Sequence, residues 1–144
     1  MKKWNIRINR IVIFNIILIC IFFFIYWDKN RINNDFSKTI KLLKDTRFEA
    51  IHNNQLMIVR FYKKKIIVEN NLHTTVRCLS VPTLYHVNYD TILGNNMIVF
   101  NGHGTSTYNI RIHGGDLTLK SWLGFKRHIH INCTGLVKEG LYPA

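Results

Sequence analysis

The pattern of apolar and polar positions divides the chain into three consecutive parts. Residues 11–27 read IVIFNIILICIFFFIYW, an apolar run without a charged residue. From residue 28 to residue 55 the apolar residues recur at helical spacing. After Gln55, short runs of β-branched and aromatic residues alternate with turn residues, which is typical of strands. We therefore expect a membrane helix at 11–27, an amphipathic helix at 28–55 and a β-sheet domain at 56–144.

The apolar run predicts a single transmembrane helix. Crossing the hydrocarbon takes roughly 17 to 25 residues, so residues 11–27 span it with little tilt. Trp4, Tyr26 and Trp27 are placed for the two interfaces. Residues 1–10 form a basic leader, and the positive-inside rule therefore predicts a cytoplasmic N-terminus and an extracytoplasmic C-terminal domain in the cell membrane.

Two other interpretations of this run are weaker. No small-residue cleavage site follows it, so we do not expect a cleaved secretory signal. A soluble protein that buries the run as a core helix is disfavoured, because the run lacks the polar stripe of a globular helix.

Asn15 places an amide inside the apolar run. An amide in hydrocarbon usually finds a partner on another helix. The alternative is that Asn15 lies near enough to the cytoplasmic interface to be hydrated. We take Asn15, with Phe14 and Phe22, as candidate subunit-packing residues.

The segment after the run predicts a long helix continuing outward from the membrane. Neither Pro nor Gly interrupts it, so a continuous helix is favoured over a break capped by Asp35 or Ser37. Its buried stripe is predicted to contain Phe36, Ile40, Leu43, Arg47, Ala50 and Ile51.

The C-terminal part predicts an α+β fold in which antiparallel strands fold over one face of the helix. Turn residues such as Asn101-Gly102 and Thr134-Gly135 separate the apolar runs. The expected strands are 56–62, 65–69, 74–79, 97–100, 108–112, 116–120 and 127–132.

The net charge favours anionic binding partners but does not identify one class. The formal net charge is +12, from 20 Lys and Arg against 8 Asp and Glu. Such an excess favours lipid headgroups, nucleic acid or acidic protein faces. The candidate DNA contacts are Lys63, Lys64, Lys65, Lys126 and Arg127, although a basic run in a turn is more often a solvated surface.

The sequence offers little catalytic chemistry. No nucleophile motif or carboxylate pair occurs, so we expect neither an enzyme nor a small-molecule substrate. The seven histidines lack Cys or carboxylate companions at ligand spacing, so we expect no metal site and no cofactor. Cys78 and Cys133 are a candidate disulfide in an oxidising compartment, with two buried free thiols as the alternative.

Four stretches behind the apolar helix resemble one family in order and spacing. They are residues 46–55 (TRFEAIHNNQ), 100–104 (FNGHG), 114–119 (GGDLTL) and 126–138 (KRHIHINCTGLVK). Together they are similar to the GspH/FimT family of minor pseudopilins, which includes competence pseudopilins of the ComGD kind. The residues that match the family motifs are Arg47, Glu49, Ala50, Gly102, Gly115 and Gly135.

The resemblance implies a pilin-like structural subunit of a type II secretion, type IV pilus or DNA-uptake machine, with other pilin-like subunits as partners. A DNA receptor and an unrelated single-pass membrane protein are the alternatives. The chain departs from the family at its leader. If the leader ends at Arg10, that residue replaces the Gly at which prepilin peptidase cuts, and Asn15 replaces the Glu at the fifth position of the mature helix.

Overall fold

The chain begins with one continuous helix, α1 (Lys2–His52), and the other regular elements of the described residues are strands. The computed structural model describes residues 2–62, 65–80, 86–88, 97–108, 111–112 and 115–140. The expected uninterrupted helix is confirmed. It forms because the first helix-breaking residues of the chain are Pro82 and Gly94, far beyond its end. At Asp35 and Ser37, where a break was the alternative, the helix continues.

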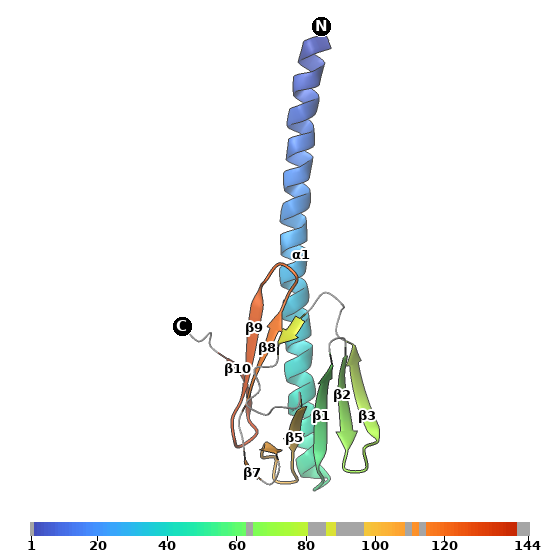
Figure 1. Cartoon of the computed structure of the whole chain (residues 1–144), viewed down its shortest axis with the longest axis vertical. Coiled ribbons are helices and arrows are strands. Elements are labelled where there is room, and N and C mark those ends of the chain that lie inside the picture. The colour runs from blue at the N-terminus through green and yellow to red at the C-terminus, as the bar shows by residue number, and fades with distance from the viewer. Residues whose placement is uncertain are drawn as a thin grey trace.

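Two four-stranded antiparallel sheets follow the helix (Figure 1). The first has the order β3-β2-β1-β5, and the second the order β10-β9-β8-β4. The first contains β1 (Met57–Tyr62), β2 (Lys65–Asn70), β3 (Thr75–Ser80) and β5 (Met97–Phe100). The second contains β4 (His86–Asn88), β8 (Gly115–Lys120), β9 (Lys126–Ile131) and β10 (Val137–Gly140).

Three predicted boundaries are corrected. The helix ends at His52 rather than at residue 55, because Asn54 adopts a left-handed φ of 47° and the Gln55 amide bonds back to the Ala50 carbonyl. The expected strand at 108–112 is two short antiparallel strands, β6 (Thr107–Tyr108) and β7 (Arg111–Ile112). Strands β4 and β10 are not among the seven expected strands, although the family resemblance at 126–138 covers the start of β10.

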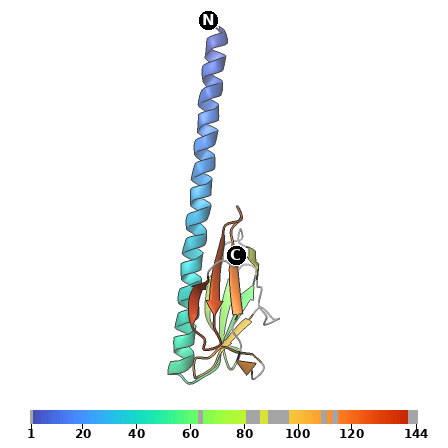
Figure 2. The same ribbon diagram turned by 90° about the vertical axis from the view of Figure 1, so that its left-hand side faces the viewer.

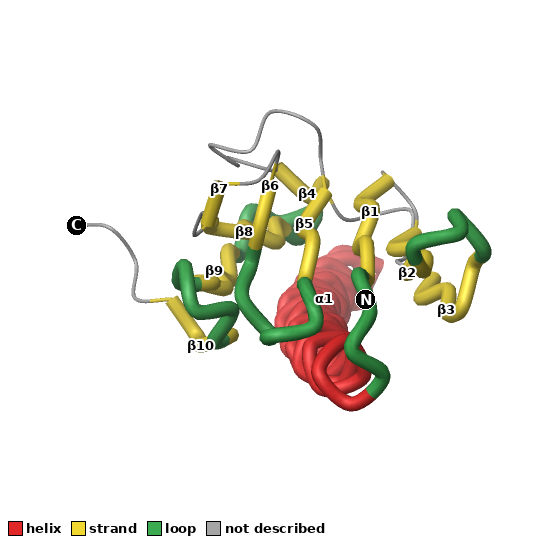
Figure 3. Tube along the Cα trace, turned by 90° about the horizontal axis from the view of Figure 1, so that it is seen from below, coloured by secondary structure: helices red, strands yellow, loops and turns green. Residues whose placement is uncertain are grey.

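The strands lie along one side of α1 and leave its other side uncovered, as the view along the helix shows (Figure 3). The predicted stripe is buried at Phe36, Leu43 and Ala50, whereas Ile51 is exposed. Each fully buried large apolar side chain contributes about 1.5–3 kcal/mol. The core cluster contains Ile32, Phe36, Leu43, Ala50, Met57, Val59, Phe61, Ile66, Val68, Ile98, Phe100, Leu117, Leu119, Ile129, Ile131 and Val137.

Candidate assembly surface and the contacts that hold the domain on the helix

The N-terminal half of α1 extends beyond the β-domain (Figures 1 and 2). Its apolar side chains from Ile11 to Phe23 are exposed, so none of the described residues covers them. Within the described residues, α1 is the one helix long and apolar enough to cross a membrane. A continuous exposed apolar surface of this kind needs a lipid or protein environment. The alternative of a helix buried in a soluble core is wrong for the chain as folded.

The three candidate subunit-packing residues all lie on this uncovered half. Phe14 is 62% exposed and Phe22 is 70% exposed. Asn15 is also exposed, and its seven-residue spacing from Phe22 puts the two side chains on the same face, two turns apart. The arrangement leaves both open to a neighbouring helix.

Asp28 is a polar contact at the near end of the domain, close to the apolar run. Its side chain is only 1% exposed, and its Oδ2 accepts hydrogen bonds from Ser121 Oγ at 2.7 Å and from the Leu123 amide at 3.1 Å. One turn earlier, the Phe24 ring lies edge-on to Trp122, with centroids 5.4 Å apart. The β8–β9 turn is thereby held against the end of the apolar run.

Arg127 attaches the second sheet to the helix. Its Nε and Nη2 donate to Asn33 Oδ1 at 2.9 and 2.8 Å, and its Nη1 lies 3.2 Å from Glu139 Oε1. The guanidinium also lies 5.7 Å from the centre of the Phe36 ring. Arg127 is therefore a bonded structural side chain that joins the second sheet to the helix.

The other described candidate DNA contacts lie on strands of different sheets. Lys65 is exposed at the start of β2, with its Nζ 5.6 Å from the Tyr62 ring centre, and Lys126 is exposed at the start of β9. Lys63 and Lys64 lie outside the described residues.

The far end of the helix is held by Arg47, which the resemblance singled out. Its Nε donates to the Gly104 carbonyl at 2.9 Å and its Nη2 to the Thr134 carbonyl at 3.4 Å. Gly135 has a φ of 75°, and a Cβ there would collide with the Gly104 carbonyl oxygen. A Cβ on Gly102 would collide with Asn54. Because these glycines lack a side chain, the turn that contains Gly102 can pack against the turn that contains Gly135 and against the end of the helix.

The remaining motif residues serve the same packing. Ala50 is fully buried against the strands. Arg77 Nη2 of β3 lies 2.9 Å from Glu49 Oε2, and Arg77 Nη1 lies 4.0 Å from Asp45 Oδ2, so β3 is ion-paired to the helix. Gly115 begins β8 opposite Ile131.

Four hairpin turns share one hydrogen-bond pattern. In each, the amide of the first residue donates to the carbonyl of the fifth, and the carbonyl of the first accepts from the amide of the fourth. The side-chain oxygen of the first residue also accepts from the amide of the fifth. The fourth residue has a positive φ in every case: His73, Gly104, Gly124 or Gly135. The turns are residues 70–74, 101–105, 121–125 and 132–136.

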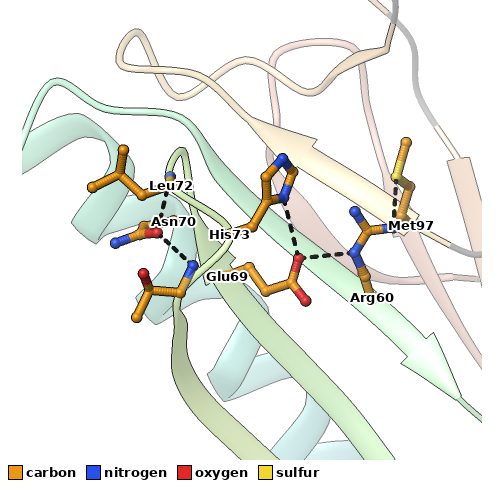
Figure 4. A network of polar contacts seen from close by, with 7 residues as sticks. Arg60, Glu69, Asn70, Leu72, His73 and Met97 are labelled. Atoms are coloured by element: carbon orange, nitrogen blue, oxygen red, sulfur yellow. Dashed lines mark hydrogen bonds and ion pairs between the residues drawn. The ribbon is translucent and has the colours of Figure 1, made fainter.

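Figure 4 shows the first of these turns beside a cross-strand ion pair. Asn70 Oδ1 accepts from the Leu72 and Thr74 amides, and Arg60 Nε lies 2.9 Å from Glu69 Oε2. The bond to Glu69 raises the pKa of the Arg60 guanidinium. The pair stabilises the β1–β2 hairpin.

The described cysteines and histidines form no metal site or disulfide with one another. Cys78 and Cys133 are free and exposed, so the candidate disulfide is not formed in this structure, and the alternative of two buried thiols is wrong about burial. His128 Nδ1 lies 2.8 Å from Thr118 Oγ1, and His130 Nδ1 lies 2.7 Å from Asp116 Oδ1. Among the described side chains, no group of three His, Cys, Asp or Glu is placed to hold a metal.

Sequence reasoning missed two of the residues that fasten the domain to the helix. Neither Asp28 nor Asn33 belongs to a sequence pattern that singles it out. The shared turn pattern, Asn or Ser followed three positions later by Gly or His, was the available signal for the turns.

A long N-terminal apolar helix packed on antiparallel sheets is the pilin fold. The chain superposes on the type IV minor pilin FimU of Pseudomonas aeruginosa strain PAO1. In one crystal form the TM-score is 0.65 at 11% identity, covering 79% of this chain and 91% of that chain. In a second form it is 0.58 at 12% identity, covering 73% and 89%.

At these identities the likeness shows the fold alone. The expected α+β, pilin-like fold is confirmed. No protein-family model and no curated protein sequence matches the chain.

Proposed function

We propose that the chain is a minor pseudopilin-like structural subunit, without catalytic activity, that assembles with other pilin-like subunits through its N-terminal helix. The observation that carries this proposal is the exposed apolar half of α1, continuous with the helix that supports the β-domain. The apolar half and the half that carries the β-domain belong to one continuous helix. Packing of the apolar half against neighbouring subunits therefore fixes the position of the β-domain.

The apolar half has the dimensions of a membrane segment. Residues 11–27 of a helix rise about 26 Å, close to the hydrocarbon thickness of about 30 Å. We propose that it holds the subunit in the cell membrane as a single pass, with a cytoplasmic N-terminus and an extracytoplasmic domain. A type II secretion, type IV pilus or competence machine of the GspH/FimT kind is the proposed setting, supported by the motif residues that join the sheets to the helix.

Site-specific cross-linking tests the proposal. In a chain with Cys20, Cys78 and Cys133 changed to Ser, Phe22→Cys is labelled with benzophenone maleimide in membranes from cells that contain the machine, and is then irradiated so that the benzophenone inserts into a C–H bond of any neighbouring chain. We expect a product with the added mass of a pilin-like subunit. Leu72→Cys, exposed on the far turn of the domain, is the matched control and gives none. Equal yields from both positions would contradict assembly through the helix.

The same assay decides the role of Asn15. If its amide bonds to a neighbouring helix, Asn15→Leu in the Phe22→Cys chain lowers the cross-linked yield. An unchanged yield would mean that Asn15 is hydrated at the interface.

A further inference from the structure

The β8–β9 turn, residues 121–125, presents apolar side chains to solvent beside the end of the apolar run. Trp122 is 60% exposed and Leu123 is 44% exposed. Gly124 has a φ of 90° with open space around it. Its counterpart at the far end of the domain, the turn at 70–74, carries Asn71 where this turn carries Trp122.

Contacts with the helix fix the depth of this turn. Asp28 is hydrogen-bonded to Ser121 and Leu123, and Trp122 reaches back to Phe24, which lies within the apolar run. Phe24 and Asp28 are four positions apart on the helix, about 6 Å along its axis. If residues 11–27 span a bilayer, Trp122 therefore lies closer than Asp28 to the middle of the bilayer.

The surroundings match the boundary between acyl chains and headgroups. Trp27 and Tyr26 lie on the helix at the same level, where aromatic rings gather in membrane proteins. Basic residues lie next to the turn on the strands and on the helix. They are Lys120 of β8, Lys126 of β9, and Lys29 and Arg31 of α1. The Arg31 guanidinium lies 4.8 Å from the centre of the Trp27 ring. Cations at this level favour anionic lipid headgroups.

We propose that the β8–β9 turn is a second membrane-contacting element, which inserts Trp122 and Leu123 into the headgroup boundary of an anionic bilayer. The buried Asp28 holds the turn at this depth. The inference needs only that the apolar run crosses a bilayer and does not depend on assembly with other subunits.

Fluorescence of the full-length chain in vesicles tests this proposal. The chain carries Trp4→Phe and Trp27→Phe, so that Trp122 is the single reporter, in phosphatidylglycerol–phosphatidylcholine vesicles with or without brominated acyl chains. We expect brominated lipid to quench Trp122 and its emission to lie at shorter wavelength than that of an exposed tryptophan.

The matched control moves the reporter to the same position of the far turn. It carries Asn71→Trp with Trp4, Trp27 and Trp122 changed to Phe, and we expect acrylamide but not brominated lipid to quench it. Equal emission of Trp122 in the two lipids would overturn the proposal. If Trp122 were shielded from both quenchers only at high protein-to-lipid ratio, a second copy would cover the turn, and the proposal would also fail.

Discussion

Arg47 Nε donates a 2.9 Å hydrogen bond to the carbonyl oxygen of Gly104. The same side chain reaches the Thr134 carbonyl, so one residue of the helix joins the turn after β5 in the first sheet to the β9–β10 turn in the second. The domain is thus fastened to α1 at its far end by Arg47 and at its near end by Asp28 and Asn33.

Removing the Arg47 side chain should destabilise the domain. Arg47→Ala leaves two carbonyl oxygens without this donor, which costs about 1–3 kcal/mol. Lys44→Ala, on an exposed position one turn earlier, should change stability by less than about 0.5 kcal/mol. Thermal unfolding of the full chain in detergent, followed by circular dichroism, compares them. Equal melting temperatures would contradict the role of Arg47.

Substitutions at two glycines with positive φ distinguish the effect of backbone strain on stability from the effect of close packing. Gly135→Ala and Gly124→Ala each place a side chain in the left-handed region, at roughly 1–2 kcal/mol. Only at Gly135 would the new Cβ also meet backbone, namely the Gly104 carbonyl. We therefore expect a clearly lower melting temperature for Gly135→Ala. If the two variants melt together, the two turns do not pack as described.

A structural role and a DNA-binding role of Arg127 predict different results for a conservative substitution. Arg127→Lys keeps the charge but loses the planar group that bonds Asn33 Oδ1 through two nitrogens. We expect it to lower the melting temperature, and its effect to be non-additive with that of Asn33→Ala in a double-mutant cycle. A residue that serves only as a cation for DNA would tolerate Lys with no loss of stability, and salt-sensitive DNA retention would be preserved.

Asp35 makes stability depend on pH. Burial raises the pKa of its carboxyl above the usual 3.8, while Lys38 and Arg31 lower it in part. The side chain is 8% exposed, and its Oδ2 has no hydrogen-bond partner. The folded chain therefore holds this proton more tightly than the unfolded chain. The contribution of Asp35 to stability is highest below pH 3.8 and is lost as the pH rises through the folded pKa.

Asp35→Asn cannot ionise and should raise the melting temperature at pH 7 by a few degrees. The advantage should shrink as the pH falls to 3.8 and below. Asp45→Asn, at an exposed position of the same helix, is the control and should show little change at neutral pH. A stabilisation by Asp35→Asn that is the same at every pH would show that the carboxyl is not responsible.

Local patterns in the sequence predicted the elements well, because periodicity, Pro and Gly act over a few residues. The helix end was placed three residues late, since Asn53 and Asn54 carry no signal as strong as Gly and the left-handed φ of Asn54 depends on the turn that follows. Strand β4 has only three residues, too short for a pattern to identify.

The contacts that position the domain were beyond such reasoning. Ser121 is 93 residues from Asp28 in sequence, and Arg127 is 94 residues from Asn33. Arg127 looked like a surface cation because its neighbour Lys126 is also basic. Only the register of β9 against the helix reveals that the guanidinium is bonded.

The most direct test of the central claim replaces residues 11–27 with a leucine run of equal length. That chain still carries an apolar helix able to span the membrane, but it lacks the side chains offered to neighbouring subunits. Both chains, tagged at the C-terminus, are captured in mild detergent from cells that contain a pilin-assembling machine, and the bound proteins are identified by mass. We predict that pilin-like subunits are captured with the native helix and lost with the leucine helix. Equal capture by both chains, or capture by neither, would contradict assembly through this surface.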